Sequence, residues 1–486
     1  MNQRPTRRQH PARPRPGTAR GVSAPEPDIV RPGASARDVA SVVLDDYKRT
    51  GEFVSDLLNR HDRTAALGPD DRRLAMELTG GIVRRQATLD VLISSCVRRP
   101  RGQVETGLWN LLQLGAYQLI FLESIPAYAA IHETVETARH RGHPDWTGFL
   151  NGVLRGISRL LTDVRVAAPA ADALPLSDGL YRKLQEQVFA EPAAKSTEYV
   201  CQAFSFPEWL IGRWSKRLDF AELCRLGFWF NAPARLTLRA NSLRTNRAAL
   251  LEALRSAGIE ARPGTHPSAV LLSGSARVED LPGFGEGWFA VQDESAMQAA
   301  EMLAVQPGWN VLDLCAAPGT KTTHLAELMR NEGQIIAADV DLQRIERITE
   351  NSRRLGATII EPRFVVPDGS DIPAGPFDAI LVDVPCSNTG VLGKRPEVRW
   401  RLSPRDLEEL PRVQQRLLSA AIERLKPGGR LVYSTCSIEP EENADVVSRV
   451  LSSDSVSGRV RLLTDSHHVP GRPADGGYQA LLVREA

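Results

Sequence analysis

Short apolar segments alternate with helical stretches from residue 286 to residue 486, and this alternation is the strongest constraint on the fold. Each apolar segment has the length of one buried strand, and each intervening stretch can form a helix that crosses back over a sheet. Such an order is typical of a doubly wound, mostly parallel α/β sheet. In open sheets of this kind, ligands bind beyond the carboxyl ends of the strands. The expected strands are Asn310–Leu314, Gln334–Asp339, Arg363–Val366, Ala379–Val384 and Arg430–Ser434.

The part of the 486-residue chain before this sheet divides into four segments. Residues 1–35 contain seven arginines and seven prolines and carry a net charge of +5, which predicts a disordered basic tail. From 36 to 165 apolar residues recur with the helical period, which predicts an all-α domain. The Ala- and Pro-rich segment 166–195 is typical of a linker. Residues 196–285 predict a small α+β domain, with strands Arg235–Asn241 and Ala269–Leu272 and a helix Arg247–Ala257.

The cysteine pattern and the lack of long apolar runs exclude several classes of protein. The six cysteines form no Cys-x-x-Cys pair, which excludes a zinc ribbon or thioredoxin-like site and favours a reducing compartment. His132, His140 and His143 have no cysteine nearby, so we expect no metal site. No run reaches the ~18 apolar residues of a membrane span. The amino terminus also lacks the apolar core of a secretory signal, so we expect a cytoplasmic protein.

The first expected strand runs into a turn of small residues and then into a helix, through Asp313-Leu-Cys-Ala-Ala-Pro-Gly-Thr-Lys-Thr322. Small residues allow a ligand to approach the backbone at the end of a strand. The turn is not a phosphate-binding loop, because Cys315 and Thr320 stand where a Walker motif needs glycine. The dinucleotide pattern Gly-x-Gly-x-x-Gly is also absent from this turn.

Acidic residues follow the next two expected strands. Asp339 ends the second strand, twenty residues after Gly319. An acid at this position can accept both ribose hydroxyls of an adenosine-containing ligand. Asp368 follows the third strand and is placed to reach the adenine amino group. A nucleoside ligand without a phosphate-binding loop indicates S-adenosylmethionine as the cofactor.

Two cysteines follow the fourth and fifth expected strands, in Asp383-Val-Pro-Cys386-Ser and Ser434-Thr-Cys436-Ser. A thiol at the positive edge of such a sheet can have a lowered pKa and become a nucleophile. Two thiols beside a methyl donor indicate an acceptor carbon that must first be activated. C5 of a pyrimidine is such a carbon, since thiolate addition at C6 creates an enamine that attacks the methyl group.

Four segments closely resemble the RNA (cytosine-5) methyltransferases of the NOL1/NOP2/Sun family. They are 313–322, Asp383-Val-Pro-Cys-Ser-Asn-Thr-Gly390, Arg395-Pro-Glu-Val-Arg-Trp400 and Tyr433-Ser-Thr-Cys-Ser-Ile-Glu-Pro-Glu-Glu-Asn443. The helical region, with Arg37-Asp-Val-Ala, Ile131-His-Glu-Thr-Val-Glu and Gly152-Val-Leu-Arg155, resembles the NusB RNA-binding domain. This fusion is similar to the bacterial RsmB type, which modifies small-subunit ribosomal RNA. The resemblance implies an all-α NusB-like domain, a small α+β RNA-binding subdomain and a Rossmann-like class I methyltransferase domain.

The resemblance also implies a role for each matching residue. Cys436 corresponds to the nucleophile and Cys386 to the residue that assists release of the covalent adduct, with Asp383 at the cytosine edge and Lys321 at the reacting base. The cofactor site comprises Cys315, Ala316, Ala317, Pro318, Gly319, Thr320, Lys321, Asp339, Asp368 and Asp383. RNA binding is assigned to Arg239, Asn241, Arg395 and Trp400. The chain departs from the family at Thr320, where Gly is usual; a positive φ there would strain threonine.

The function expected from this resemblance is methylation of C5 of a cytidine in 16S ribosomal RNA. The RNA is expected to be unassembled or partly assembled, and the enzyme to be a monomer without metal. One alternative keeps the chemistry with transfer RNA as the substrate. Another is a non-catalytic RNA-binding or antitermination factor. Cys386 is also a rival for the nucleophile, because DNA cytosine-5 methyltransferases use the cysteine of a Pro-Cys pair.

Overall fold

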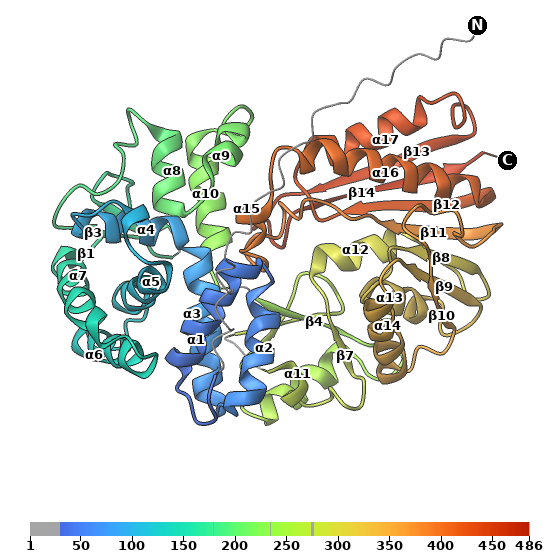
Figure 1. The fold of residues 1–486 in the computed structure, drawn as a ribbon. Helices are drawn as coiled ribbons and strands as arrows, with labels where there is room; N and C mark the ends of the chain where they lie inside the picture. Colours follow the sequence, from blue (N-terminus) through green and yellow to red (C-terminus); the bar gives the residue numbers. More distant parts are fainter. Residues whose placement is uncertain (1–29, 178, 234, 274–276, 486) are drawn as a thin grey trace, which may run out of the picture.

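The computed structural model describes residues 30–485 except 178, 234 and 274–276, and it divides into two bodies joined through a central region (Figure 1). Most of the predicted basic tail, residues 1–29, lies outside the described residues. The tail was expected to extend to residue 35, but Val30 is buried in the amino-terminal core and Ser35 caps the first helix. Residues 30–35 therefore belong to the amino-terminal domain and not to the predicted tail.

The amino-terminal body is a bundle of seven helices. Leu111, Leu112 and Leu114 have no exposed surface, because the fifth helix is enclosed by its neighbours. The first helix begins with a capping box between Ser35 and Asp38, which satisfies backbone donors that a helix start leaves open. The all-α prediction is confirmed. The helices are α1 Ala36–Thr50, α2 Val54–Ala65, α3 Pro69–Arg84, α4 Gln86–Cys96, α5 Thr106–Phe121, α6 Ala127–His140 and α7 Thr147–Leu160.

Residues 166–195 do not form the expected linker. They contain two strands that complete a three-stranded antiparallel sheet, β1 Leu161–Val166, β3 Tyr181–Leu184 and β2 Ala173–Pro175. Ala173 and Leu174 are fully buried, and the Tyr199 hydroxyl donates to the Ala173 carbonyl. Composition was misleading here, because small residues and proline also suit short strands packed closely on helices.

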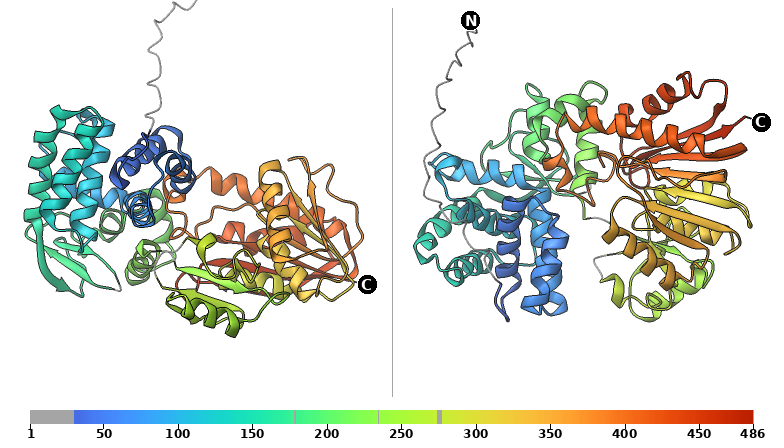
Figure 2. Two further views of the ribbon diagram at one scale, coloured as in Figure 1. Left: turned by 90° about the horizontal axis from the view of Figure 1, so that it is seen from below. Right: turned by 45° about the vertical axis from the view of Figure 1, so that its right-hand side comes forward.

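Three further helices pack on the amino-terminal core although they follow the predicted linker. They are α8 Ser196–Phe204, α9 Glu208–Trp214 and α10 Phe220–Asn231. Their buried residues, including Phe204, Trp214 and Phe230, share one hydrophobic cluster with the first seven helices. In the right view of Figure 2 these green helices lie where the two bodies meet.

The small α+β region follows these helices as a four-stranded antiparallel sheet with one helix. The predicted strands at 235–241 and 269–272 and the predicted helix at 247–257 are all present within one or two residues. The strand order is β5 Ala261–Pro263, β6 Ala269–Leu272, β4 Leu236–Ala240 and β7 Phe289–Val291, with α11 Arg247–Ser256.

The carboxyl-terminal domain is a seven-stranded sheet with the order β10-β9-β8-β11-β12-β14-β13. Its first five strands are parallel, and β14 pairs antiparallel with both β12 and β13, so the prediction of a doubly wound, mostly parallel α/β sheet is confirmed. The strand order reverses between β8 and β11, which is where such sheets bind ligands. The strands are β8 Asn310–Leu314, β9 Gln334–Asp339, β10 Ile360–Phe364, β11 Phe377–Asp383, β12 Leu425–Thr435, β13 Val460–His468 and β14 Gly477–Arg484. The helices are α12 Glu294–Leu303, α13 Thr320–Leu328, α14 Leu342–Leu355, α15 Val398–Arg401, α16 Asp406–Glu423 and α17 Ala444–Leu451.

The segment around α15 joins the two bodies. Arg399 has no exposed surface, and its guanidinium donates to the carbonyls of Ser205 at 2.9 Å and Phe230 at 3.2 Å. The indole N–H of Trp400 donates to the carbonyl of Val83 at 3.0 Å. Trp400 was expected to bind RNA, but its polar atom is used here to attach α15 to the amino-terminal body.

Candidate active site

The small-residue turn after β8 lies at the point where the strand order reverses. Cys315, with φ of 68°, and Gly319, with φ of 93°, lie in the left-handed region, and Thr320 is the first residue of α13. Threonine in place of the usual glycine therefore causes no backbone strain at 320. A Cβ atom at Gly319 would lie 3.3 Å from the Cα of Ile348, a tight contact, so close packing as well as the positive φ favours glycine there.

Asp339 lies at the end of β9 and contacts this turn. The backbone N–H of Ala317 donates to Asp339 Oδ2 at 3.0 Å, and that of Asp341 donates to Oδ1 at 3.2 Å. Arg344 donates to the Ala317 carbonyl at 2.5 Å, which holds the other side of the turn. A carboxylate has about four acceptor sites, so Asp339 can support the turn and still accept hydroxyl groups from a ligand.

Asp313 is a site residue that the sequence analysis did not single out, although it begins the recognised turn motif. It is almost fully buried, and the Thr322 hydroxyl donates to its Oδ2 at 2.6 Å. Burial raises the pKa of Asp313 to about 7, and the neighbouring Asp383 carboxylate adds to this effect. Its Oδ1 has no hydrogen-bond partner among the described residues. A buried acceptor without a donor fits a ligand that brings a cationic or N–H group.

These observations agree with a site for S-adenosylmethionine. The turn offers small residues at Ala316 and Ala317, an acid at Asp339 and an unsatisfied carboxylate oxygen at Asp313. Asp368 does not join them, because it is exposed and accepts a hydrogen bond from the Ser370 N–H in its own turn.

Lys321 and Asp383 form an ion pair between the start of α13 and the end of β11. Lys321 Nζ lies 2.6 Å from Asp383 Oδ2. Burial opposes the charge of Lys321, but the attraction of Asp383, with smaller contributions from Cys436 and Asp313, outweighs it and raises the pKa of Lys321. A positive charge thus lies close to the cysteine after β12.

The two cysteines meet beyond the ends of the adjacent parallel strands β11 and β12. Cys386 Sγ and Cys436 Sγ are 3.2 Å apart, and Cys436 Sγ is 3.1 Å from Asn388 Oδ1. A hydrogen bond to Cys436, burial and the nearby Glu442 all raise the pKa of Cys386 well above its ordinary value. The geometry therefore favours a protonated Cys386 beside Cys436.

A buried glutamate ties together the loops that carry the cysteines. Glu442 accepts hydrogen bonds from the hydroxyls of Ser387 and Ser437, which follow the two cysteines, and from the Ser387 N–H at 2.8 Å. Gln414 of α16 donates to the same carboxylate at 2.9 Å. Burial raises the pKa of Glu442 in spite of these donors. The role of Glu442 was missed, although it lies in the recognised 433–443 string.

Arg239 and Asn241 were expected to bind RNA, but neither has exposed surface. Arg239 of β4 donates to the Thr320 carbonyl at 2.9 Å and pairs with Glu327 of α13 at 2.6 Å. Asn241 donates to the Gly287 carbonyl at 2.7 Å and the Leu355 carbonyl at 2.8 Å. The expectation is wrong for this conformation, because both side chains attach the small sheet to the methyltransferase domain. Arg395, by contrast, is exposed.

A cavity of about 820 Å³ lies among the amino-terminal body, the small sheet and the methyltransferase domain. Trp229 lies on its wall, and the Arg235 guanidinium lies 5.5 Å from the centre of that ring system. The other cationic residues that line it are Arg225, Arg262, Lys394 and Arg472.

The described residues contain no cluster of three or more metal-ligating side chains, and none of their helices is long and apolar enough to cross a membrane.

Comparison with known proteins gives a consistent result along the chain. Family models match residues 34–159 (NusB family), 206–279 (RsmF/B-like, ferredoxin-like domain) and 300–469 (16S rRNA methyltransferase RsmB/F). A probable ribosomal RNA small subunit methyltransferase B of Synechocystis is 34% identical over 90% of this chain and 98% of its own. The ribosomal RNA small subunit methyltransferase B of Salmonella paratyphi C is 33% identical over 92% of this chain and 98% of its own.

The crystal structure of PH0851 shares the fold, with a TM-score of 0.72 at 24% identity over 94% of this chain and all of that one. Because the sequence similarity extends over nearly the full length of these relatives, the chain belongs to the RsmB/F family of ribosomal RNA small subunit methyltransferases.

Proposed function

We propose that the protein transfers a methyl group from S-adenosylmethionine to C5 of a cytidine in 16S ribosomal RNA, through a covalent bond between Cys436 and C6. The observation that carries this proposal is the 3.2 Å approach of Cys386 and Cys436 at the ends of adjacent strands. The Lys321–Asp383 pair lies beside them. A simple methyl transfer to an already nucleophilic atom would need neither thiol.

The cofactor is held by the turn after β8 and the acid after β9. Asp339 would accept the ribose hydroxyls, and the unsatisfied Asp313 Oδ1 would accept an N–H of the methionine part. S-adenosylmethionine, when bound, supplies an electrophilic methyl group. Ala316, Ala317 and Gly319 of this turn have small side chains or none, which allows a ligand to approach the backbone.

The chemistry begins with Cys436. As a thiolate it adds to C6 of the target cytosine, which makes C5 nucleophilic. Lys321 favours the thiolate through its positive charge, and Asp383 accepts a hydrogen bond from the cytosine amino group. The base must be unstacked for this attack, since a thiolate cannot reach C6 inside a helix.

Cys386 acts after C5 carries the methyl group. The adduct must then lose the C5 proton and expel the Cys436 sulfur, which restores the C5–C6 double bond. The raised pKa of Cys386 keeps it protonated, and therefore not a nucleophile, during the attack. In the elimination, Cys386 gives its proton to the departing Cys436 sulfur and takes up the C5 proton in exchange, so it ends the step as a thiol again. This assignment separates the protein from enzymes that attack with the Pro-Cys cysteine.

The RNA is bound between the two bodies. The NusB-like helices, Arg395 and the cavity with Trp229 and Arg235 offer cationic and aromatic groups of the kind that hold phosphates and splayed bases. The relatives are named for the small subunit of the ribosome, which favours 16S ribosomal RNA over transfer RNA.

The function can be tested by incubating the protein and S-adenosylmethionine with 16S ribosomal RNA, in parallel with transfer RNA, followed by bisulfite sequencing. We expect one new protected cytosine in 16S RNA and none in transfer RNA. A protected cytosine only in transfer RNA would mean that transfer RNA is the substrate of the same reaction. RNA binding without any protected cytosine would support the non-catalytic alternative instead.

A further inference from the structure

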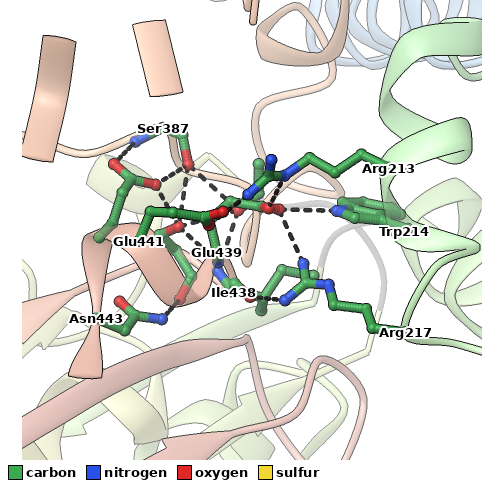
Figure 3. Close-up of polar contacts among 11 residues, drawn as sticks. Arg213, Trp214, Arg217, Ser387, Ile438, Glu439, Glu441 and Asn443 are labelled. Carbon is green, nitrogen blue, oxygen red and sulfur yellow. Dashed lines mark hydrogen bonds and ion pairs between the residues drawn. The ribbon is translucent and has the colours of Figure 1, made fainter. Parts of the chain in front are cut away.

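Side chains of the amino-terminal body bind Glu439 and so fix the loop that carries Cys436. The Glu439 side chain has no exposed surface, although it lies only three residues after Cys436. Arg213 Nε donates to Glu439 Oε2 at 2.6 Å, and Trp214 Nε1 donates to Oε1 at 2.7 Å. Arg217, in the turn after α9, donates to the same Oε1 at 3.1 Å and to the Ile438 carbonyl at 2.7 Å. Figure 3 shows these three side chains reaching from the α9 region to the loop.

Removing a partner from this contact should cost more than removing one from an ordinary surface ion pair. A buried carboxylate loses its hydration and is stable only while its charge and lone pairs are satisfied. Arg213 and Arg217 are 30% exposed, whereas Glu439 is fully enclosed, so the carboxylate depends on its partners more than they depend on it. Trp214 is itself a buried core residue beside Phe206 and Phe230, which makes the anchoring side of the contact rigid.

Further hydrogen bonds connect Glu439 to both cysteines. The Glu439 N–H donates to the Ser437 hydroxyl at 3.0 Å, and that hydroxyl belongs to the Glu442 network that also holds Ser387. The Gly390 N–H donates to the Cys436 carbonyl at 2.9 Å. Leu392, in the segment after Cys386, is fully buried in the hydrophobic cluster of the amino-terminal body. Both cysteine loops are thus anchored outside their own domain.

We propose that Arg213, Trp214 and Arg217 are positioning residues that hold Glu439, and through it Cys436, in the geometry needed for attack on RNA. The amino-terminal body would then assemble the reacting pair as well as bind RNA. This inference rests on the proposed role of Cys436 as the nucleophile. A displacement of a reacting atom by about 1 Å can slow a reaction about 10²-fold. Loss of the contacts to Glu439 should therefore slow the attack of Cys436 on the RNA without changing the affinity for RNA or S-adenosylmethionine.

The test uses the full-length protein and RNA carrying 5-fluorocytidine, in which C5 has no proton to lose and the covalent adduct is trapped. The variants are Arg213→Ala, Arg213→Lys, Arg217→Ala and Glu439→Gln. Lys426→Ala, which breaks a partly buried pair with Asp378 at the starts of β12 and β11, the opposite end of the sheet from the cysteines, is the matched control. The measurements are the single-turnover rate of adduct formation on denaturing gels, the dissociation constants for RNA and S-adenosylmethionine, and the unfolding midpoint.

We expect Arg213→Ala, Arg217→Ala and Glu439→Gln to form the adduct at least about tenfold more slowly, with both dissociation constants within about twofold of wild type. Arg213→Lys should recover part of the rate, and Lys426→Ala should react like wild type. If Glu439→Gln fails to fold, the two arginine variants, whose side chains are partly exposed, decide the question. Adduct formation at the wild-type rate in both arginine variants, or a loss fully explained by weaker RNA binding, would overturn the positioning role. Absence of any adduct with the wild-type protein would instead overturn the proposed function.

Discussion

The cofactor edge, which is the turn after β8 together with Asp339, and the cysteine pair lie at the same end of one sheet. Different parts of the chain hold each of them in place. The turn after β8 is supported by Asp339, Arg344 and Asp313, all from its own domain. The cysteine loops are supported by Arg213, Trp214 and Arg217 and by the burial of Leu392 and Arg399 in the amino-terminal body. The cofactor site is therefore held by its own domain and by Arg239 of the adjacent small sheet, whereas the cysteine loops depend on the amino-terminal body.

The largest expected effect separates the two cysteines. Cys436→Ala should lower methylation by at least about 10³-fold and abolish covalent RNA attachment, because it removes the nucleophile. Cys386→Ala should still attack but stall before elimination, leaving adducts that survive denaturing gels. Donor binding, measured by calorimetry, should be unchanged in both, as in the control Cys96→Ala in α4.

An adduct that accumulates with Cys436→Ala and disappears with Cys386→Ala would reverse the two assignments. Weakened donor binding in either variant would show that the cofactor edge and the cysteine pair are not independent.

The next effect concerns the attachment of α15 to the amino-terminal body. Arg399→Ala should lower the free energy of unfolding by about 3 kcal/mol, because it leaves several buried carbonyls without a donor. Denaturant unfolding measures this loss. Arg395→Ala, an exposed residue in the same segment, should change it by less than about 0.5 kcal/mol. Equal stability of the two variants would contradict the importance of this attachment.

A smaller effect is expected at the cofactor edge. Asp339→Ala should weaken S-adenosylmethionine binding by at least ~1.5 kcal/mol, the order of a charge-assisted hydrogen bond. Asp368→Ala is the control, since its side chain is exposed and bonds only within its own turn. Calorimetry that finds the same affinity for Asp339→Ala and wild type would remove Asp339 from the site.

The smallest effect is a pH dependence of donor binding that originates at Asp313. The pKa of this group is raised to about 7, so it is protonated below that pH and ionised above it. S-adenosylmethionine is cationic and should bind more tightly to the ionised Asp313 carboxylate than to the neutral acid. Its affinity should therefore rise by up to about tenfold between about pH 6 and pH 8. Asp313→Asn should flatten the profile. A wild-type profile without this rise would mean that Asp313 does not contact the donor.

The sequence was most informative where function depends on local structure. Two of the five expected strands of the carboxyl-terminal sheet, Asn310–Leu314 and Gln334–Asp339, have the predicted bounds, and two more are present with different ends. The strand expected at Arg363–Val366 lies three residues earlier, at Ile360–Phe364. The sequence was least informative where a residue's role depends on distant partners. Arg239 and Asn241 were expected to bind RNA, and nothing in the pattern Arg-x-Asn indicates that both are enclosed between two domains. The segment 166–195 was expected to be a linker because composition does not show that Ala173 and Leu174 pack on a helix.

The sequence by itself determined the domain order, the parallel sheet, the small-residue turn and the two cysteines at strand ends, because these follow from periodicity and from short motifs whose residues lie close together in the chain. Only the tertiary structure decided that the thiols lie 3.2 Å apart, that Asp313 is buried with a raised pKa, and that Glu439 is enclosed by α9 and the turn after it. The physical reason is that burial and charge depend on which surfaces meet. Residues 213 and 439 are brought together only when both bodies have folded and packed against each other.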